Sequence, residues 1–116
     1  LTNGILKNTS VLLKNMEFCL NNFDIFIGPS IQKCCFEVSN DIVKRFPSKY
    51  VKQKSVGKFT VDLQKIAFEE LHFYGFCYDN IKITDDCSYC REDIYFSFRR
   101  EGANAKRMIG LIGFEA

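Results

Sequence analysis

The spacing of apolar residues along the chain predicts three helices. Residues 3–16 place apolar side chains on one face at helical spacing, with lysines and asparagines largely elsewhere, which predicts an amphipathic helix. A second helix is predicted over 63–74, because Asp62 can cap its first turn and Gly75 stands where a left-handed C-terminal cap is expected. A short third helix is predicted over 42–46, where Pro47 ends it.

Short runs rich in aromatic and β-branched residues predict the strands. The run 31–38 is a further apolar stretch that contains the adjacent pair Cys34 and Cys35, and we take it to be extended. Strands mixed with two or three helices on one core predict an α+β fold, in which the helices flank one or more mixed sheets. The predicted strands lie at 23–27, 50–51, 58–61, 81–84, 95–99 and 108–112.

Composition narrows the class of protein. A chain of 116 residues that is 47% hydrophobic predicts one domain, and 12 Phe and 5 Tyr exclude a disordered tail. The net charge of +2, with no cluster of basic residues, argues against a nucleic-acid partner. No apolar run approaches the roughly 20 residues that span a bilayer, and no signal-peptide pattern is present. We therefore expect a cytoplasmic protein without a membrane partner.

The six cysteines admit three interpretations, and the single histidine limits them. Disulfide scaffolds are poor in large apolar residues, unlike this chain. A zinc site could combine the C-x-x-C pair Cys87 and Cys90 with Cys34 and Cys35, but adjacent residues on a strand point to opposite faces. We therefore predict no metal ligand here and interpret the cysteines as small buried hydrophobes. His72 alone offers one ligand, so helix-end packing is the simpler interpretation.

Three ordered segments resemble a known family. They are residues 27–38 (IGPSIQKCCFEV), the helix that opens at 61–63 (VDL), and the run from 87–90 (CSYC) through 95–102 (YFSFRREG) to 107–112 (RMIGLI). In this order and spacing they resemble the C-terminal half of the YfiH-like laccase-domain family. That family is also called multicopper polyphenol oxidoreductase and peptidoglycan editing factor, and the resemblance covers nearly the whole chain.

The resemblance implies that residues 1–116 are the C-terminal portion of a single YfiH-like laccase domain with the CNF/YfiH-like fold. Family members are about twice as long, and their zinc ligands are two histidines and a cysteine in the first half. None of these ligands has a counterpart in this chain. The resemblance therefore implies that the chain has the missing N-terminal half as a partner. His72 and the cysteine pair match no family ligand.

The family also implies an activity. Its members phosphorolyse adenosine, inosine and methylthioadenosine and deaminate adenosine with the help of zinc, so the implied partners are a purine nucleoside and phosphate. Without the ligand-bearing half, we expect this chain to be inactive. Open alternatives are copper-dependent polyphenol oxidation, peptidoglycan editing, and a non-catalytic interaction module that forms a homodimer. Copper clusters need several histidines, which disfavours the first alternative for these residues.

Candidate site residues follow from polarity within the family motifs, and no catalytic residue is assigned. Arg99 and Arg100 are candidates for phosphate or ribose contact, because guanidinium groups match phosphate oxygens in pairs. Neighbouring strand residues point to opposite faces, so we expect one of the two to enter the site. Ser97 and Arg107 are weaker candidates on the same grounds.

The motif that contains Gly28, Pro29, Cys34 and Cys35 has two open interpretations. It is either a loop beside the substrate, as its distinctive sequence motif in the family suggests, or a tight turn that serves packing alone.

Overall fold

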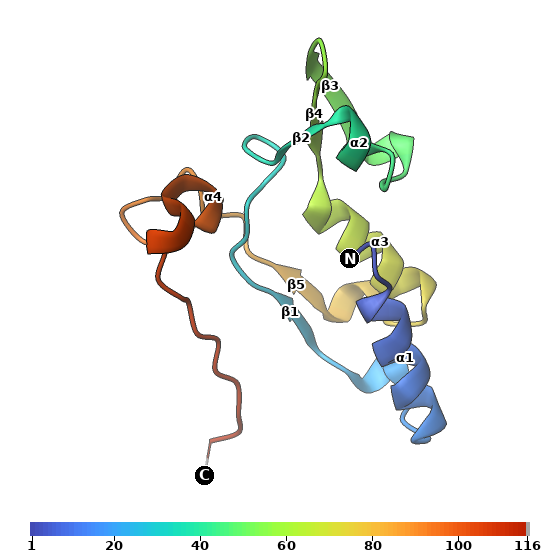
Figure 1. Ribbon diagram of the computed structural model, residues 1–116. Helices are drawn as coiled ribbons and strands as arrows, with labels where there is room; N and C mark the ends of the chain where they lie inside the picture. Colours follow the sequence, from blue (N-terminus) through green and yellow to red (C-terminus); the bar gives the residue numbers. More distant parts are fainter. Residues whose placement is uncertain (116) are drawn as a thin grey trace.

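The computed structural model describes residues 1–115, which contain two helices of three turns and several shorter elements (Figure 1). This mixture confirms the α+β prediction. The helices and strands are α1 (Ile5–Asn15), β1 (Ile25–Ile27), β2 (Glu37–Ser39), α2 (Asn40–Val43), β3 (Val51–Ser55), β4 (Lys58–Val61), α3 (Leu63–Phe73), β5 (Ile81–Ile83) and α4 (Phe98–Glu101). Short 3₁₀ turns lie at Leu20–Asn22, Ser48–Tyr50, Tyr78–Asn80 and Gly102–Asn104.

Asp62 and Gly75, the residues that predict the two ends of α3, also form the contacts found at those ends. The Asp62 carboxylate accepts a hydrogen bond from the Lys65 N–H at 3.1 Å, so the helix begins where its cap was expected. At the other end Gly75 has a φ of +117°, and the Phe76 N–H donates to the Leu71 carbonyl at 3.0 Å. The predicted helices over 63–74 and 3–16 are both confirmed.

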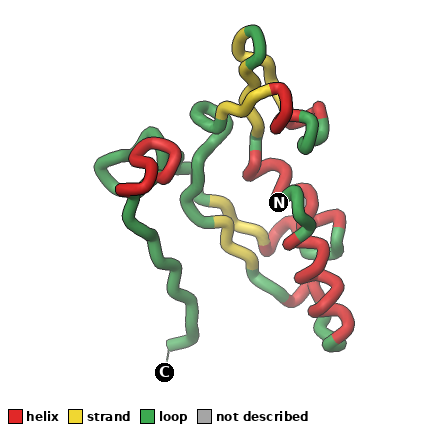
Figure 2. Tube along the Cα trace, viewed as in Figure 1, coloured by secondary structure: helices red, strands yellow, loops and turns green. Residues whose placement is uncertain are grey.

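The strands form two separate sheets (Figure 2). β1 and β5 pair in parallel, with Ile25 opposite Ile81 and Ile27 opposite Ile83. β2, β4 and β3 form an antiparallel sheet in that order. In the parallel pair each strand has one neighbour among the described residues, so its outer edge is open.

Two hydrophobic clusters share α3. The first, which we call the helical cluster, contains Leu20, Leu71, Phe76 and Ile81 beneath α1. The second, the hairpin cluster, contains Val38, Val61 and Ile66. Because Leu71 and Ile66 lie on the same helix, α3 connects the parallel pair to the antiparallel sheet.

The molecule is more extended than a compact domain of this length. Its radius of gyration is 16.0 Å, against about 13 Å expected for a compact domain of this length. Figure 1 shows the segment after α4 running away from the rest of the chain, and its Leu111 and Ile112 are 94% and 85% exposed. Within residues 1–115, no helix has both the length and the apolarity needed to cross a bilayer.

Several predicted elements are wrong. Residues 95–99 are not a strand, because Ser97 caps α4 there. Residues 108–112 are irregular: the described part of the chain provides no strand to pair with them. The helix predicted over 42–46 ends earlier, at Val43, and turns before Pro47.

Candidate functional site

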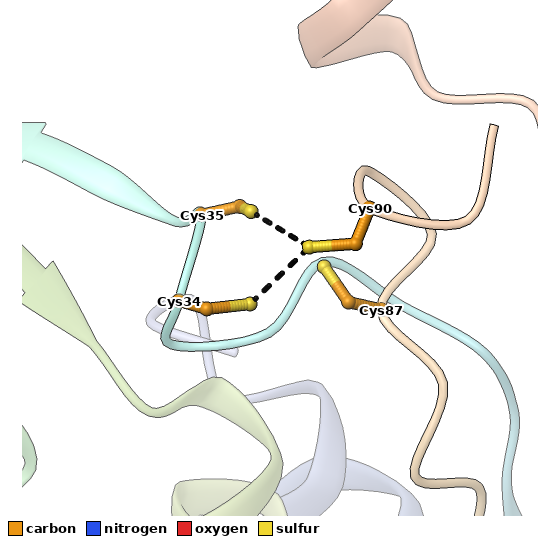
Figure 3. A group of neighbouring side chains, drawn as sticks. All are labelled: Cys34, Cys35, Cys87 and Cys90. Carbon is orange, nitrogen blue, oxygen red and sulfur yellow. Dashed lines mark hydrogen bonds between the residues drawn. The ribbon is translucent and has the colours of Figure 1, made fainter.

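Four cysteines from two distant segments meet at one point (Figure 3). Cys34 and Cys35 lie between β1 and β2, and Cys87 and Cys90 follow β5. Their four sulfur atoms all lie within 4.8 Å of one another. The Sγ of Cys90 is 3.3 Å from that of Cys35 and 3.7 Å from that of Cys34. In residues 1–115 this is the one group of three or more His, Cys, Asp or Glu side chains arranged to hold a metal ion.

The conformation of the backbone at Cys34 and Cys35 explains why both side chains can reach the same cluster. Lys33–Cys35 form a turn rather than a strand, since the N–H groups of Cys35 and Phe36 both donate to the Gln32 carbonyl, at 3.0 and 2.8 Å. The prediction that the two cysteines point to opposite faces is therefore wrong. That alternation applies to an extended chain, and extended pairing begins only at Glu37.

The second cysteine segment is held beside the first by backbone contacts. Ser30 and Cys87 form an isolated parallel bridge, in which the Ser88 N–H donates to the Ser30 carbonyl at 3.0 Å. The Gln32 N–H points at the Cys87 sulfur, 3.4 Å away. The parallel pairing of β1 with β5 thus continues into the cysteine cluster and sets its position.

Gln64 of α3 hydrogen-bonds to both of the segments that lead to the cysteines. Its side-chain amide donates to the Ser30 hydroxyl at 3.2 Å and to the Thr84 carbonyl at 3.0 Å, and the residue is buried. Sequence reasoning missed Gln64, because a polar residue inside an amphipathic helix gives no local sign that it faces the interior.

Three of the four thiols, Cys34, Cys35 and Cys87, have shifted pKa values. Partial loss of water around the sulfur raises the pKa of Cys34 and of Cys35, which opposes their ionisation. Burial opposes ionisation at Cys87 too, but hydrogen bonds from nearby backbone N–H groups, Gln32 foremost, outweigh it and lower the pKa to about 6. Of Cys34, Cys35 and Cys87, Cys87 is therefore the thiol that loses its proton most readily.

Arg99 and Arg100 each hold one of the two cysteine loops. The Arg100 guanidinium donates to the carbonyls of Ser88, Tyr89 and Tyr95 at 2.9, 2.6 and 2.6 Å. Arg99 donates to the Glu37 carbonyl at 2.7 Å, just beyond the cysteine turn. The two arginines lie on a helix, not on the predicted strand, and their side chains reach different loops; their contact with phosphate stays a prediction.

The other predicted site residues are spread over the molecule. Ser97 is buried, and its hydroxyl accepts a hydrogen bond from the Arg100 N–H at 3.4 Å, so it serves as a helix cap. Arg107 is exposed in the segment that follows α4. Gly28 and Pro29 connect β1 to Ser30 and so deliver the chain to the cysteine turn. Contact of these residues with a substrate stays a prediction.

A cationic hollow beside Cys34 also escaped prediction. Its volume is about 410 Å³, and its lining includes Lys33, Lys52 and Lys54. Lys52 and Lys54 both lie on β3, whose pairing with β4 is irregular between Gln53 and Ser55. The sequence shows the two lysines, but not the position of the cysteine turn beside them.

The single histidine, His72, does not support a copper site in this chain. Nδ1 of His72 is 3.2 Å from the Phe76 carbonyl, and its ring stacks on Tyr78 with centroids 3.5 Å apart. Copper oxidase clusters use several imidazoles, and this chain has one histidine, which packs at the end of α3. These residues therefore do not fit a multicopper site.

Curated relatives share this region of sequence. Purine nucleoside phosphorylase SA1030 of Staphylococcus aureus (strain N315) is 29% identical over 108 residues, which cover 88% of this chain and 41% of that protein. Purine nucleoside phosphorylase SSP1584 of Staphylococcus saprophyticus is 28% identical over 110 residues, covering 90% of this chain and 42% of that protein. The chain thus spans about two-fifths of the length of these relatives.

Solved structures share the fold. Bacillus licheniformis hypothetical protein YfiH superposes with a TM-score of 0.78 at 21% identity, over 85% of this chain and 40% of that one. Neisseria meningitidis protein NMB0706 superposes with a TM-score of 0.75 at 27% identity, over 88% of this chain and 43% of that one. The family model described as multi-copper polyphenol oxidoreductase laccase matches residues 1–115. The chain therefore belongs to this YfiH-like laccase family.

Proposed function

We propose that residues 1–116 are the C-terminal portion of a YfiH-like domain in a purine nucleoside phosphorylase. The whole protein would phosphorolyse adenosine, inosine and methylthioadenosine and would also deaminate adenosine. The observation that carries the proposal is the match of 88% of this chain to a relative named purine nucleoside phosphorylase. The chain covers 41% of that relative, as a portion of a longer enzyme would.

Phosphorolysis needs cationic groups that hold phosphate while an oxygen of the phosphate bonds to the ribose C1′. As that bond forms, the bond from C1′ to the purine nitrogen breaks, and the base leaves with the electron pair and takes a proton. Lys52 lines the cationic hollow, and Arg99 is exposed, with its guanidinium group donating to the Glu37 carbonyl. These two side chains are the best placed in this chain to reach a phosphate.

The deaminase step needs an activated water. In this proposal a zinc ion held by residues outside this chain supplies it when bound. This chain contributes the surface beside that centre, and by itself it is inactive.

We propose that a groove between β1 and the C-terminal segment receives a strand from the N-terminal portion of the protein. The groove measures about 710 Å³ and lies between the open edge of β1 and residues 110–112. Its lining includes Ile25, Phe26 and Leu111, the last of which is 94% exposed. A strand seated there would hydrogen-bond to β1 and cover these side chains. A second copy of the chain is the competing occupant.

The activity is tested by comparing this chain with the longer protein that contains it. With inosine and phosphate, we expect the longer protein to release hypoxanthine and ribose 1-phosphate, and residues 1–116 alone to release neither. Omitting phosphate is the control and should stop ribose 1-phosphate formation. Turnover by residues 1–116 alone would overturn the proposal that the ligand-bearing half is required. An inactive longer protein would overturn the phosphorylase assignment itself.

A further inference from the structure

We infer that Cys34, Cys35, Cys87 and Cys90 bind one zinc ion in a tetrahedral, structural site within this chain. This inference does not depend on the nucleoside chemistry proposed above. The site differs from the family zinc that the resemblance places in the N-terminal half, because all of its ligands lie in residues 34–90.

The sulfur positions suit a zinc ion. A tetrahedral site with zinc–sulfur bonds of about 2.3 Å requires its sulfur atoms to lie about 3.8 Å apart. The Cys90 sulfur is 3.7 Å from that of Cys34 and 3.3 Å from that of Cys35, and the whole set lies within 4.8 Å. Small side-chain rotations therefore bring the four sulfurs to bonding distance around one centre, which Figure 3 shows them facing.

The spacing of the ligands along the chain is also suitable. Cys87 and Cys90 form a C-x-x-C pair on a turn, closed by the Arg91 N–H donating to the Cys87 carbonyl at 3.0 Å. The turn at Lys33–Cys35 provides the other two ligands. Structural zinc sites usually take cysteine ligands from pairs spaced C-x₂₋₄-C. Cys87 and Cys90 have that spacing, whereas Cys34 and Cys35 are adjacent and reach the same point because their turn is not extended.

Hydrogen-bond donors and a positive charge near the four cysteines can offset the negative charge of a zinc–thiolate site. When zinc binds, it replaces the proton of each thiol, and the protons pass to the solvent; four thiolates around Zn²⁺ then carry a net negative charge. The Gln32 N–H is already directed at the Cys87 sulfur at 3.4 Å. The positively charged Arg100 guanidinium donates hydrogen bonds to the carbonyls of Ser88 and Tyr89, the two residues between Cys87 and Cys90.

The ligand set favours zinc in a structural role. Four soft thiolates in a tetrahedral arrangement select zinc or iron, whereas magnesium and calcium prefer oxygen. Since cysteines fill all four positions, none is left for a substrate or a water molecule. The ion would instead join the β1–β2 connection to the segment after β5, which are about 55 residues apart in sequence.

The test measures metal content and thiol protection in residues 1–116, purified without a histidine tag, under reducing conditions and with added zinc. We expect about one zinc per chain by elemental mass spectrometry. Cys34 and Cys90 are exposed, so they should resist alkylation until a chelator is added, whereas exposed Cys19 should react throughout. Cobalt in place of zinc should give the absorption bands of a tetrahedral thiolate site.

Two variants separate the site from the other cysteines. Cys90→Ser should weaken zinc binding more than about 100-fold, since changing even outer-shell partners of a metal costs about 10- to 100-fold. Cys19→Ser is the matched control and should bind zinc as the unaltered chain does. If Cys90→Ser does not fold, as judged by circular dichroism, the cobalt spectrum and alkylation pattern of the unaltered chain decide the question.

Four results would overturn the inference. They are an unaltered chain that binds no zinc, unchanged affinity in folded Cys90→Ser, stoichiometric iron in place of zinc, and a disulfide among the four cysteines that forms while zinc is present. In the last case peptide masses would show paired cysteines, and the cluster would be a redox pair rather than a metal site.

Discussion

Arg99 and Arg100 show how single side chains shape this molecule. They are neighbours on α4, yet Arg99 donates to the Glu37 carbonyl beyond the first cysteine turn and Arg100 to carbonyls around the second. A guanidinium group has five donors in a fixed plane, so it can satisfy several carbonyls of an irregular loop. The Arg100 side chain is only 14% exposed, so these hydrogen bonds are largely protected from competing water.

Replacing Arg100 should therefore loosen the Cys87–Cys90 loop. We expect Arg100→Gln to lower the free energy of unfolding by about 1.5–3 kcal/mol, the range for hydrogen bonds to charged groups. Denaturant titration measures this loss, and hydrogen exchange should show faster exchange at Ser88 and Arg91. Arg107→Gln, on the exposed segment, should change stability by less than about 0.5 kcal/mol. Equal stability of the two variants would contradict the structural role of Arg100.

At the scale of elements, α3 connects the two hydrophobic clusters. Its Leu71 is buried in the helical cluster and its Ile66 in the hairpin cluster. Gln64, two residues before Ile66, hydrogen-bonds to Ser30 and Thr84 in the segments that lead to the cysteines. Loss of packing on this helix should therefore affect both sheets together, so we expect one cooperative unfolding transition.

Ile66 is the position that tests this coupling. Ile66→Ala should lower the free energy of unfolding by about 2–5 kcal/mol, because the side chain is 3% exposed and its removal leaves a cavity. Val56→Ala is the matched control: Val56 is 95% exposed at the β3–β4 turn, so its loss should be less than about 0.5 kcal/mol. Near-ultraviolet and far-ultraviolet signals should change at the same denaturant concentration. Separate transitions for the two signals would show that the clusters unfold independently.

The elements predicted correctly are those with local signals. Asp62 and Gly75 bound α3 through contacts with its own first and last turns, so the sequence alone locates the helix. The segment 95–99 has the alternation of a strand, but Ser97 caps α4 and Tyr95 accepts a hydrogen bond from Arg100. Both contacts span five residues or fewer, so they are local too: the strand-like alternation and the serine cap compete within the same residues, and the alternation alone predicts the wrong element.

At the scale of the whole molecule, the described residues 1–115 are extended and leave apolar side chains exposed. Its radius of gyration is 16.0 Å, and the C-terminal segment leaves Leu111 and Ile112 open to solvent beside the free edge of β1. An exposed apolar segment next to an open strand edge favours association with another chain or segment. The proposed N-terminal strand would satisfy both features.

Association is therefore the expected behaviour of residues 1–116 alone. In sedimentation velocity the chain should self-associate with rising concentration, and adding the separately produced N-terminal portion should replace this by a one-to-one complex. Leu111→Asp should weaken both kinds of association, because a charge would be buried in the groove. Val56→Asp, exposed but outside the groove, should change neither. A chain that stays monomeric and binds no N-terminal portion would contradict the proposed groove.

The sequence by itself determined the α+β class, the two long helices, four of the strands and the family, because caps, turn residues and ordered motifs are local. It placed Arg99, Arg100 and the cysteine motifs near a site but gave their side chains the directions of extended strands. Only the tertiary structure decided that Cys34 and Cys35 share a turn and meet Cys87 and Cys90. The physical reason is that parallel pairing of β1 with β5 joins segments more than 50 residues apart, and such a contact leaves no periodic trace in either segment.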